Sequence, residues 1–186
     1  MKKIIFTGTF LLGLLVCIQP LKPQGQASGK HLFSELGGPG VIFSANFDSR
    51  FKNNERLGLG YRVGLGFGIG EFTEWTTYGP PDDYYLGYNS YTRTYYTIPA
   101  GLNYIFGKNH SPHTFEIGAG ATFLTRKLSI FYYDRKKSGH VIGHFQFMYR
   151  RIPVNGGFTF RIGFTPIIGT SGDLFPFPAV GFGYAF

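Results

Sequence analysis

The chain has 186 residues, a formal net charge of +8 and one cysteine, and 19% of its residues are aromatic. This length fits one domain. The single cysteine, Cys17, lies in the apolar N-terminal segment, so the rest of the chain has no cysteine for disulfide or thiol chemistry. The 28 glycines and the many aromatic residues favour β structure over helices.

Residues 1–27 have the pattern of a secretory signal peptide. Lys2-Lys3 begins it, and the apolar run at 4–18 is shorter than the roughly 20 residues of a membrane-spanning helix. Gly25-Gln26-Ala27 places small residues where signal peptidase reads, so we predict cleavage after Ala27. A lipoprotein signal at Cys17 is disfavoured by the bulky residue before it. Cleavage removes three lysines and no acid, so the charge falls from +8 to +5, too little to indicate a nucleic-acid partner.

Seven segments alternate with period two and are predicted as strands. They are 41–51, 57–70, 95–106, 114–126, 141–151, 158–165 and 175–186. The alternation is strongest in 57–70, where one face carries large apolar residues and the other carries glycines and Arg62. This run lacks the lysine and the strand–loop–helix context of a phosphate-binding loop. Small residues on one face instead suit the inside of a narrow barrel.

The connections alternate between short and long. Tight polar turns are expected near 52–55, 108–112 and 153–156, and longer loops at 71–93, 129–139 and 169–174. Gly37-Gly38-Pro39-Gly40 indicates a turn or sharp kink. Pro99 cannot donate a ladder hydrogen bond, so we expect a bulge there. Bacterial single-chain barrels have even strand numbers, so 30–37 is predicted as the eighth strand.

The last strand has an all-apolar face of Val180, Phe182, Tyr184 and Phe186 and an opposite face of small residues. This pattern fits a wall between lipid and a crowded interior. Its ending, Gly181-x-x-Tyr184-x-Phe186, resembles the C-terminal assembly signal of outer-membrane β-barrels of diderm bacteria.

The remainder of the chain after residue 27 also resembles the small outer membrane β-barrel proteins. The motifs that carry the resemblance are Glu35-Leu36-Gly37-Gly38-Pro39-Gly40, Ile98-Pro99-Ala100-Gly101-Leu102-Asn103-Tyr104 and the terminal Gly-Tyr-Ala-Phe. The expected fold is therefore all-β, a closed antiparallel up-and-down transmembrane barrel of eight strands over residues 28–186. The resemblance implies a place in the outer membrane, contact with its lipid and insertion by the barrel assembly machinery. It implies no particular activity.

Charged residues on the inward faces form the first candidate site. Arg62, Glu116 and Arg161 point inward in this phasing, and Glu35, Asp48 and Arg150 are candidates to join them. An unpaired charge inside a narrow barrel costs several kcal/mol. The cluster is either a gate for ions or a salt-bridged plug, and we favour the plug because side chains just fill an eight-stranded barrel.

The long connections hold two external candidates. An aromatic loop, 71–93, could bind a surface ligand or could belong to the interfacial girdle and a rigid hairpin extending the strands; its key residues are Trp75, Tyr78, Tyr84, Tyr85 and Tyr88. A basic cluster could bind lipopolysaccharide phosphates or form a solvated loop; it contains Arg126, Lys127, Arg135, Lys136 and Lys137.

Catalytic and metal chemistry find little support. Ser138-Gly139-His140 lacks a clear acidic partner for nucleophilic catalysis. His110 and His113 are too few for a metal site without further ligands. We therefore predict a non-enzymatic outer-membrane barrel without a cofactor, acting structurally or through its external loops. A small channel is the alternative, and an enzyme that modifies outer-membrane lipid is the third.

Overall fold

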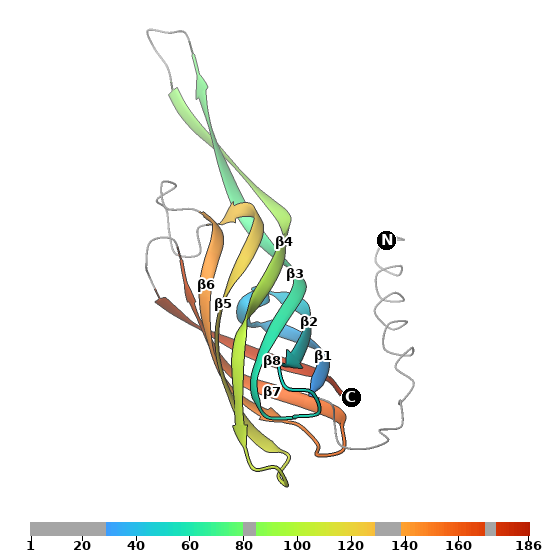
Figure 1. The fold of residues 1–186 in the computed structure, drawn as a ribbon. Coiled ribbons are helices and arrows are strands. Elements are labelled where there is room, and N and C mark those ends of the chain that lie inside the picture. Colours follow the sequence, from blue (N-terminus) through green and yellow to red (C-terminus); the bar gives the residue numbers. More distant parts are fainter. Residues whose placement is uncertain (1–28, 80–84, 129–138, 170–173) are drawn as a thin grey trace, which may run out of the picture.

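The computed structural model describes residues 29–79, 85–128, 139–169 and 174–186, with backbone alone at 71–78, 85, 86, 88, 127 and 128. Eight antiparallel strands pair in chain order, and β1 pairs with β8 to close a barrel (Figure 1). The strands are β1 Lys30–Gly37, β2 Phe43–Arg50, β3 Gly58–Tyr78, β4 Tyr85–Gly107, β5 His113–Leu128, β6 Gly139–Arg151, β7 Gly157–Ile168 and β8 Leu174–Ala185.

The architecture confirms the predicted closed eight-stranded antiparallel barrel, with 30–37 as its eighth strand. The predicted signal peptide lies outside the described residues and stays a prediction. Within the described ranges, no helix has the length and apolar character needed to cross a membrane.

The barrel has an apolar outside and a polar inside. Outward side chains such as Leu65, Phe147 and Phe164 are 70%, 55% and 60% exposed. Inward side chains such as Glu35 and Arg150 are each 1% exposed. The period-two pattern of the sequence produces this division, because successive side chains of a strand point to opposite faces of the sheet.

The short turns gather at one end of the barrel. The turns after β2, β4 and β6 lie at the lower end in Figure 1, together with the C-terminus. The β3–β4 hairpin rises far above the opposite, upper end. The two ends of the barrel therefore differ: the lower end carries the short turns, and the upper end carries the long β3–β4 hairpin.

The segment 71–93 was predicted as a loop, but its described residues are extended, in agreement with the alternative of a hairpin that continues the strands. β3 and β4 run on as a paired ribbon from Gly70, opposite Arg93, to Tyr78, opposite Tyr85. β2 pairs with β3 only as far as Phe67, so the described ribbon has two strands. Backbone pairing holds these residues extended although their sequence has no apolar face.

The bulge expected at Pro99 is also absent from the β4–β5 pair. Pro99 lies opposite Thr122 in an unbroken register. On the other side, the ladder with β3 has the same register before and after Pro99, with no pairing at Pro99 itself. Because Pro99 has no N–H donor, it interrupts the β3–β4 ladder, but no extra residue is inserted as a bulge would require. A register shift does occur in the neighbouring β5–β6 pair, between Phe123 and Leu128.

The β1–β2 connection turns into the barrel instead of extending from it. Its 3-10 helix, η1 Gly38–Gly40, is buried and lies against β1, β3, β4, β5, β7 and β8. Gly37 and Gly38 have φ of 72° and 67°, which favours glycine. Val41 has φ of 74°, a conformation that costs a residue of order 1–3 kcal/mol and persists only where its surroundings enforce it. Residues 41–42 are thus a turn, and not the predicted start of a strand.

Candidate functional site

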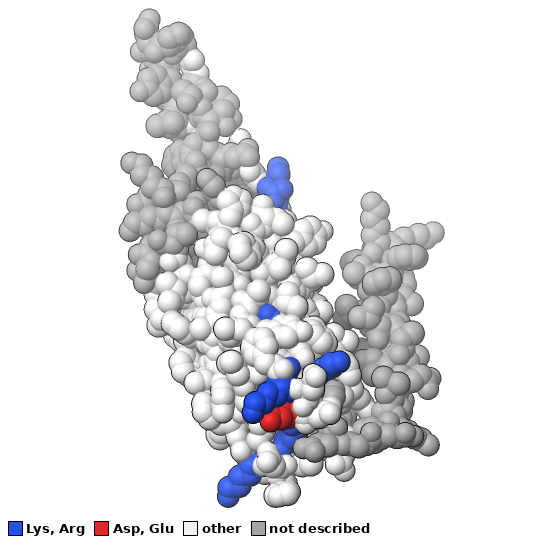
Figure 2. Space-filling view, in the orientation of Figure 1, with Lys and Arg blue, Asp and Glu red and all other residues white. Residues whose placement is uncertain are grey.

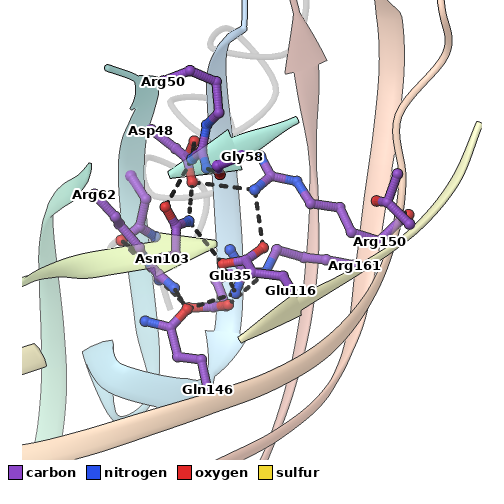
Figure 3. Close-up of polar contacts among 12 residues, drawn as sticks. Glu35, Asp48, Arg50, Gly58, Arg62, Asn103, Glu116, Gln146, Arg150 and Arg161 are labelled. Carbon is purple, nitrogen blue, oxygen red and sulfur yellow. Dashed lines mark hydrogen bonds and ion pairs between the residues drawn. The ribbon is translucent and has the colours of Figure 1, made fainter. Parts of the chain in front are cut away.

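The six predicted inward charges lie together in the middle of the barrel (Figure 3). They come from β1, β2, β3, β5, β6 and β7. A seventh residue, Arg50 on β2, joins them. We call this group the interior charge cluster: Glu35, Asp48, Arg50, Arg62, Glu116, Arg150 and Arg161, each at most 4% exposed.

Each carboxylate of the interior charge cluster contacts two arginines. Glu35 pairs with Arg62 and, at 3.3 Å, with Nε of Arg161. Asp48 pairs with Arg50 and, at 3.1 Å, with Arg150. Glu116 pairs with Arg150 at 2.9 Å and with Arg161 at 3.3 Å. The shared arginines join the three carboxylates into one network, so that each buried charge has an opposite charge beside it.

Uncharged side chains complete the network. Asn103 donates from Nδ2 to Asp48 at 2.5 Å and to Glu116 at 2.9 Å, and its Oδ1 accepts a bond from Arg50 at 2.8 Å. Oε1 of Gln146 accepts bonds from Arg62 at 3.1 Å and Arg161 at 2.9 Å. These amides satisfy charged groups that the ion pairs leave partly unsatisfied.

An aromatic ring lies at the centre of the cluster. The guanidinium carbons of Arg62, Arg161 and Arg150 lie 4.9, 4.8 and 5.5 Å from the centre of the Phe33 ring. Such cation–π contacts gain strength where water is excluded. Sequence alternation placed Phe33 and Arg50 on the inward faces, but it did not select them as members of a site.

A second arginine site closes the lower end. Arg56, in the β2–β3 turn, donates to the carbonyl oxygen of Ile152 at 2.7 Å and to those of Lys108, Asn109 and Ser111 at 2.8–3.1 Å. Burial lowers the pKa of Arg56, but an arginine keeps its proton in proteins. Ile105, Ile152, Ala185 and Leu57 pack beside it. The three short turns are thereby tied together beneath the interior charge cluster.

The inward turn η1 closes the barrel above the cluster. Thr122 donates a hydrogen bond to the carbonyl oxygen of Pro39 at 2.8 Å, and Thr97 donates to that of Gly40 at 3.2 Å. An apolar cluster lies toward the upper end, formed by Tyr95, Leu124, Ile142 and Ile167 with Val41 and Phe177 against it. The interior is therefore filled in three layers, with the charges in the middle one.

Replacing Thr122 with valine is expected to lower the free energy of unfolding by about 1–2 kcal/mol, because the carbonyl of Pro39 loses its buried donor. Urea unfolding of the refolded barrel measures this change. Thr165→Val is the matched control, since the buried Thr165 hydroxyl has no partner among the described residues and its loss is expected to be neutral or stabilising. Equal losses in both variants would show that the hydrogen bond does not hold the turn.

The external candidates fall largely on residues without described side chains. Trp75, Tyr78, Tyr85 and Tyr88 lie on the ribbon, where Trp75 is opposite Tyr88 and Tyr78 is opposite Tyr85. Tyr84 lies outside the described residues, as do Ser138 and the basic residues Arg135, Lys136 and Lys137. Arg126 and Lys127 lie on β5 near its upper end. The ribbon agrees with one of the two alternatives given for 71–93, a rigid hairpin that extends the strands.

Two of the histidines that were candidates for catalysis or metal binding, His113 and His140, each form a hydrogen bond through Nδ1. Nδ1 of His113 lies 2.6 Å from the hydroxyl of Tyr149 on the outer face. Nδ1 of His140 lies 2.9 Å from the carbonyl oxygen of Leu124. Among the described residues, no group of three or more potential ligands could hold a metal ion.

The residues of the C-terminal signature occupy the seam between β1 and β8. Gly181 faces inward beside the Arg161 side chain, and Tyr184 points outward. Phe186 is 41% exposed, and its backbone N–H donates to the carbonyl oxygen of Lys30 at 3.0 Å. The signature therefore lies where the barrel closes.

Comparison with known proteins gives no match to a protein-family model, to a curated protein or to a solved structure. The resemblance to small outer membrane β-barrel proteins thus rests on the motifs quoted above.

Proposed function

We propose that the protein is an integral outer-membrane β-barrel with a sealed interior, and that it acts structurally or through the parts that project from its upper end. The observation that carries the proposal is the inverted distribution of side chains. Large apolar residues cover the outer wall, while the interior charge cluster and Arg56 are buried inside. A water-soluble protein rarely exposes an apolar patch larger than a few hundred Å², whereas a lipid-facing band requires one.

The positions of the charged side chains and of the aromatic rings also fit a barrel whose wall lies in a membrane. On the face drawn in Figure 2, lysine and arginine side chains lie mainly toward the lower end, and the wall above them is mostly uncharged. Aromatic residues crowd the lower rim, as in the girdle at a membrane interface. Examples with ring centres 4.6–6.0 Å apart are Tyr104–Phe106, Phe51–Tyr61 and Phe115–Tyr149.

The filled interior favours a plug over a pore. A channel needs a wetted path, but Arg56, the interior charge cluster, η1 and the upper apolar cluster follow one another along the barrel axis. The ribbon of β3 and β4 then becomes the best candidate for a surface role. Its upper part projects beyond the barrel, where a partner could reach it (Figure 1).

A conductance measurement tests the sealed interior. The mature chain, refolded into planar bilayers, is expected to give no discrete current steps, while heat-modifiable gel migration shows that the barrel has formed. The variants Arg62→Gln and Glu116→Gln are expected to lower stability without opening a current. Discrete steps in the folded wild-type protein, altered by either substitution, would instead establish the channel and make these charges its filter.

Cysteine labelling tests which end faces outward. The predicted mature chain has no cysteine, so single cysteines can be introduced at two exposed asparagines, Asn89 on the ribbon and Asn53 in a lower turn. On intact cells, Asn89→Cys is expected to react with a membrane-impermeant maleimide, and Asn53→Cys only after the outer membrane is broken. The reverse pattern would place the ribbon in the periplasm and remove its surface role.

A further inference from the structure

The interior charge cluster carries an excess positive charge. In the described part of the chain it holds four guanidinium groups and three carboxylates, all buried. Arginine cannot lose its proton in a protein, so the excess of one cannot be removed by titration of these groups. A buried net charge without a counterion is costly, because the surrounding medium has a low dielectric constant.

Two arginines of the cluster face each other across neighbouring strands. Arg150 on β6 and Arg161 on β7 are register partners, and both point inward. Like charges directly opposite each other in a sheet are destabilising unless something separates or compensates them. Glu116 contacts both, at 2.9 and 3.3 Å. Asp48 also contacts Arg150 and Glu35 also contacts Arg161, but both carboxylates are shared with a further arginine. Three carboxylates therefore compensate four arginines, and one positive charge is left over.

Several buried donors of this region have no acceptor. Nη1 of Arg150 serves both Asp48 and Glu116, but among the described residues Nε and Nη2 of Arg150 have no partner. Both ring nitrogens of His31 are likewise unpaired, and this side chain is fully buried. His31 is the register partner of Asp48, which Arg150 contacts, so the unpaired groups flank the same carboxylate.

We propose that the barrel interior binds one small monatomic anion of the halide class, held by the unpaired N–H groups of Arg150 and His31. A water molecule would satisfy the N–H groups but not the excess charge, whereas a halide satisfies both. Side chains fill an eight-stranded barrel almost completely, so an ion of about the size of water fits better than a larger oxyanion. Fully buried donors favour a weakly hydrated ion that can be stripped of its water.

Crystallography of the refolded barrel with bromide in place of chloride tests the site directly. The expected result is an anomalous peak in the interior, within about 3.5 Å of Nη2 of Arg150 or of the His31 ring. Bromide found only on the protein surface, with water or nothing beside these donors, would overturn the proposal.

Thermal unfolding gives a second test that does not need crystals. An ion that binds only the folded state is expected to raise the unfolding midpoint by roughly 5–10 °C between chloride-free buffer and about 100-fold excess over its dissociation constant. Gluconate at equal ionic strength provides the baseline. Arg150→Gln, which makes the interior charge cluster neutral, is expected to lose this shift.

A second variant covers the case in which Arg150→Gln fails to fold. His31→Phe removes the other N–H donor without changing any charge of the cluster, and it is also expected to reduce the chloride shift. Lys52→Gln changes an exposed lysine of the β2–β3 turn and should leave the shift unchanged. A chloride shift that persists in His31→Phe and in every folded Arg150→Gln preparation would contradict the proposed site.

Discussion

The substitution Glu116→Gln is expected to lower the free energy of unfolding by about 3–5 kcal/mol. Glutamine has nearly the same volume, so the change removes the charge and leaves the packing in place. Arg150 and Arg161 each lose one of their two carboxylate partners, and the excess charge of the cluster rises from one to two. Urea titration of the refolded barrel, followed by gel migration and tryptophan fluorescence, measures the difference.

The exposed ion pair of the β2–β3 turn supplies the matched control. Nζ of Lys52 lies 3.4 Å from Glu55, whose side chain is 51% exposed. Exposed pairs contribute at most about 1 kcal/mol, so Glu55→Gln should have little effect. The double variant Glu116→Gln with Arg161→Gln returns the excess charge to one and should recover part of the loss. Similar effects of Glu116→Gln and Glu55→Gln would contradict the sealed, charge-packed interior.

The strand phasing could be predicted because it is a local property. In 57–70 each large apolar residue is followed by a glycine or Arg62, and this alternation alone decides which face is buried. The inward orientation of the six charged residues followed directly from such phasing. Their pairing did not, since Glu35 and Arg62 are 27 residues apart and Asp48 and Arg150 are 102 apart.

The features that sequence reasoning missed depend on distant partners. The turn at Gly38–Gly40 was expected, but its inward direction was not. That direction depends on the hydroxyl group of Thr97, 57 residues from its acceptor Gly40, and on that of Thr122, 83 residues from its acceptor Pro39. For 71–93 a hairpin extension was only one of two alternatives, because Glu71-Phe72-Thr73-Glu74 has no apolar face that would predict a strand. The extended form of this segment comes from cross-strand pairing. Arg50 was placed inward by its phase, but only the barrel geometry brings it to Asp48 and Asn103.

The interior network and the outer wall can be tested independently. Loss of a buried charge acts on stability whatever solvent surrounds the barrel, because the cluster is cut off from both water and lipid. An added charge on the outer wall acts only if that wall faces lipid. Introducing a charge on the outer wall therefore tests whether the barrel lies in a membrane.

Leu65→Arg is expected to destabilise the barrel by about 2–4 kcal/mol in lipid vesicles. Leu65 points outward from β3 and is 70% exposed, so arginine at this position meets no neighbour inside the barrel. In water such a change would be nearly neutral, since surface substitutions usually alter stability by less than 0.5 kcal/mol. The penalty arises only if the middle of the wall lies in hydrocarbon.

Leu59→Arg is the control, because Leu59 lies on the same strand and the same face. It is 50% exposed and stands one residue from the lower end of β3, where the membrane interface is proposed. The cost of an arginine falls to about 0–1 kcal/mol near an interface. Free energies of unfolding measured for both variants in the same vesicles should therefore differ by at least 1 kcal/mol, with Leu65→Arg the less stable. Equal and small effects would mean that the apolar wall is covered by something other than a bilayer.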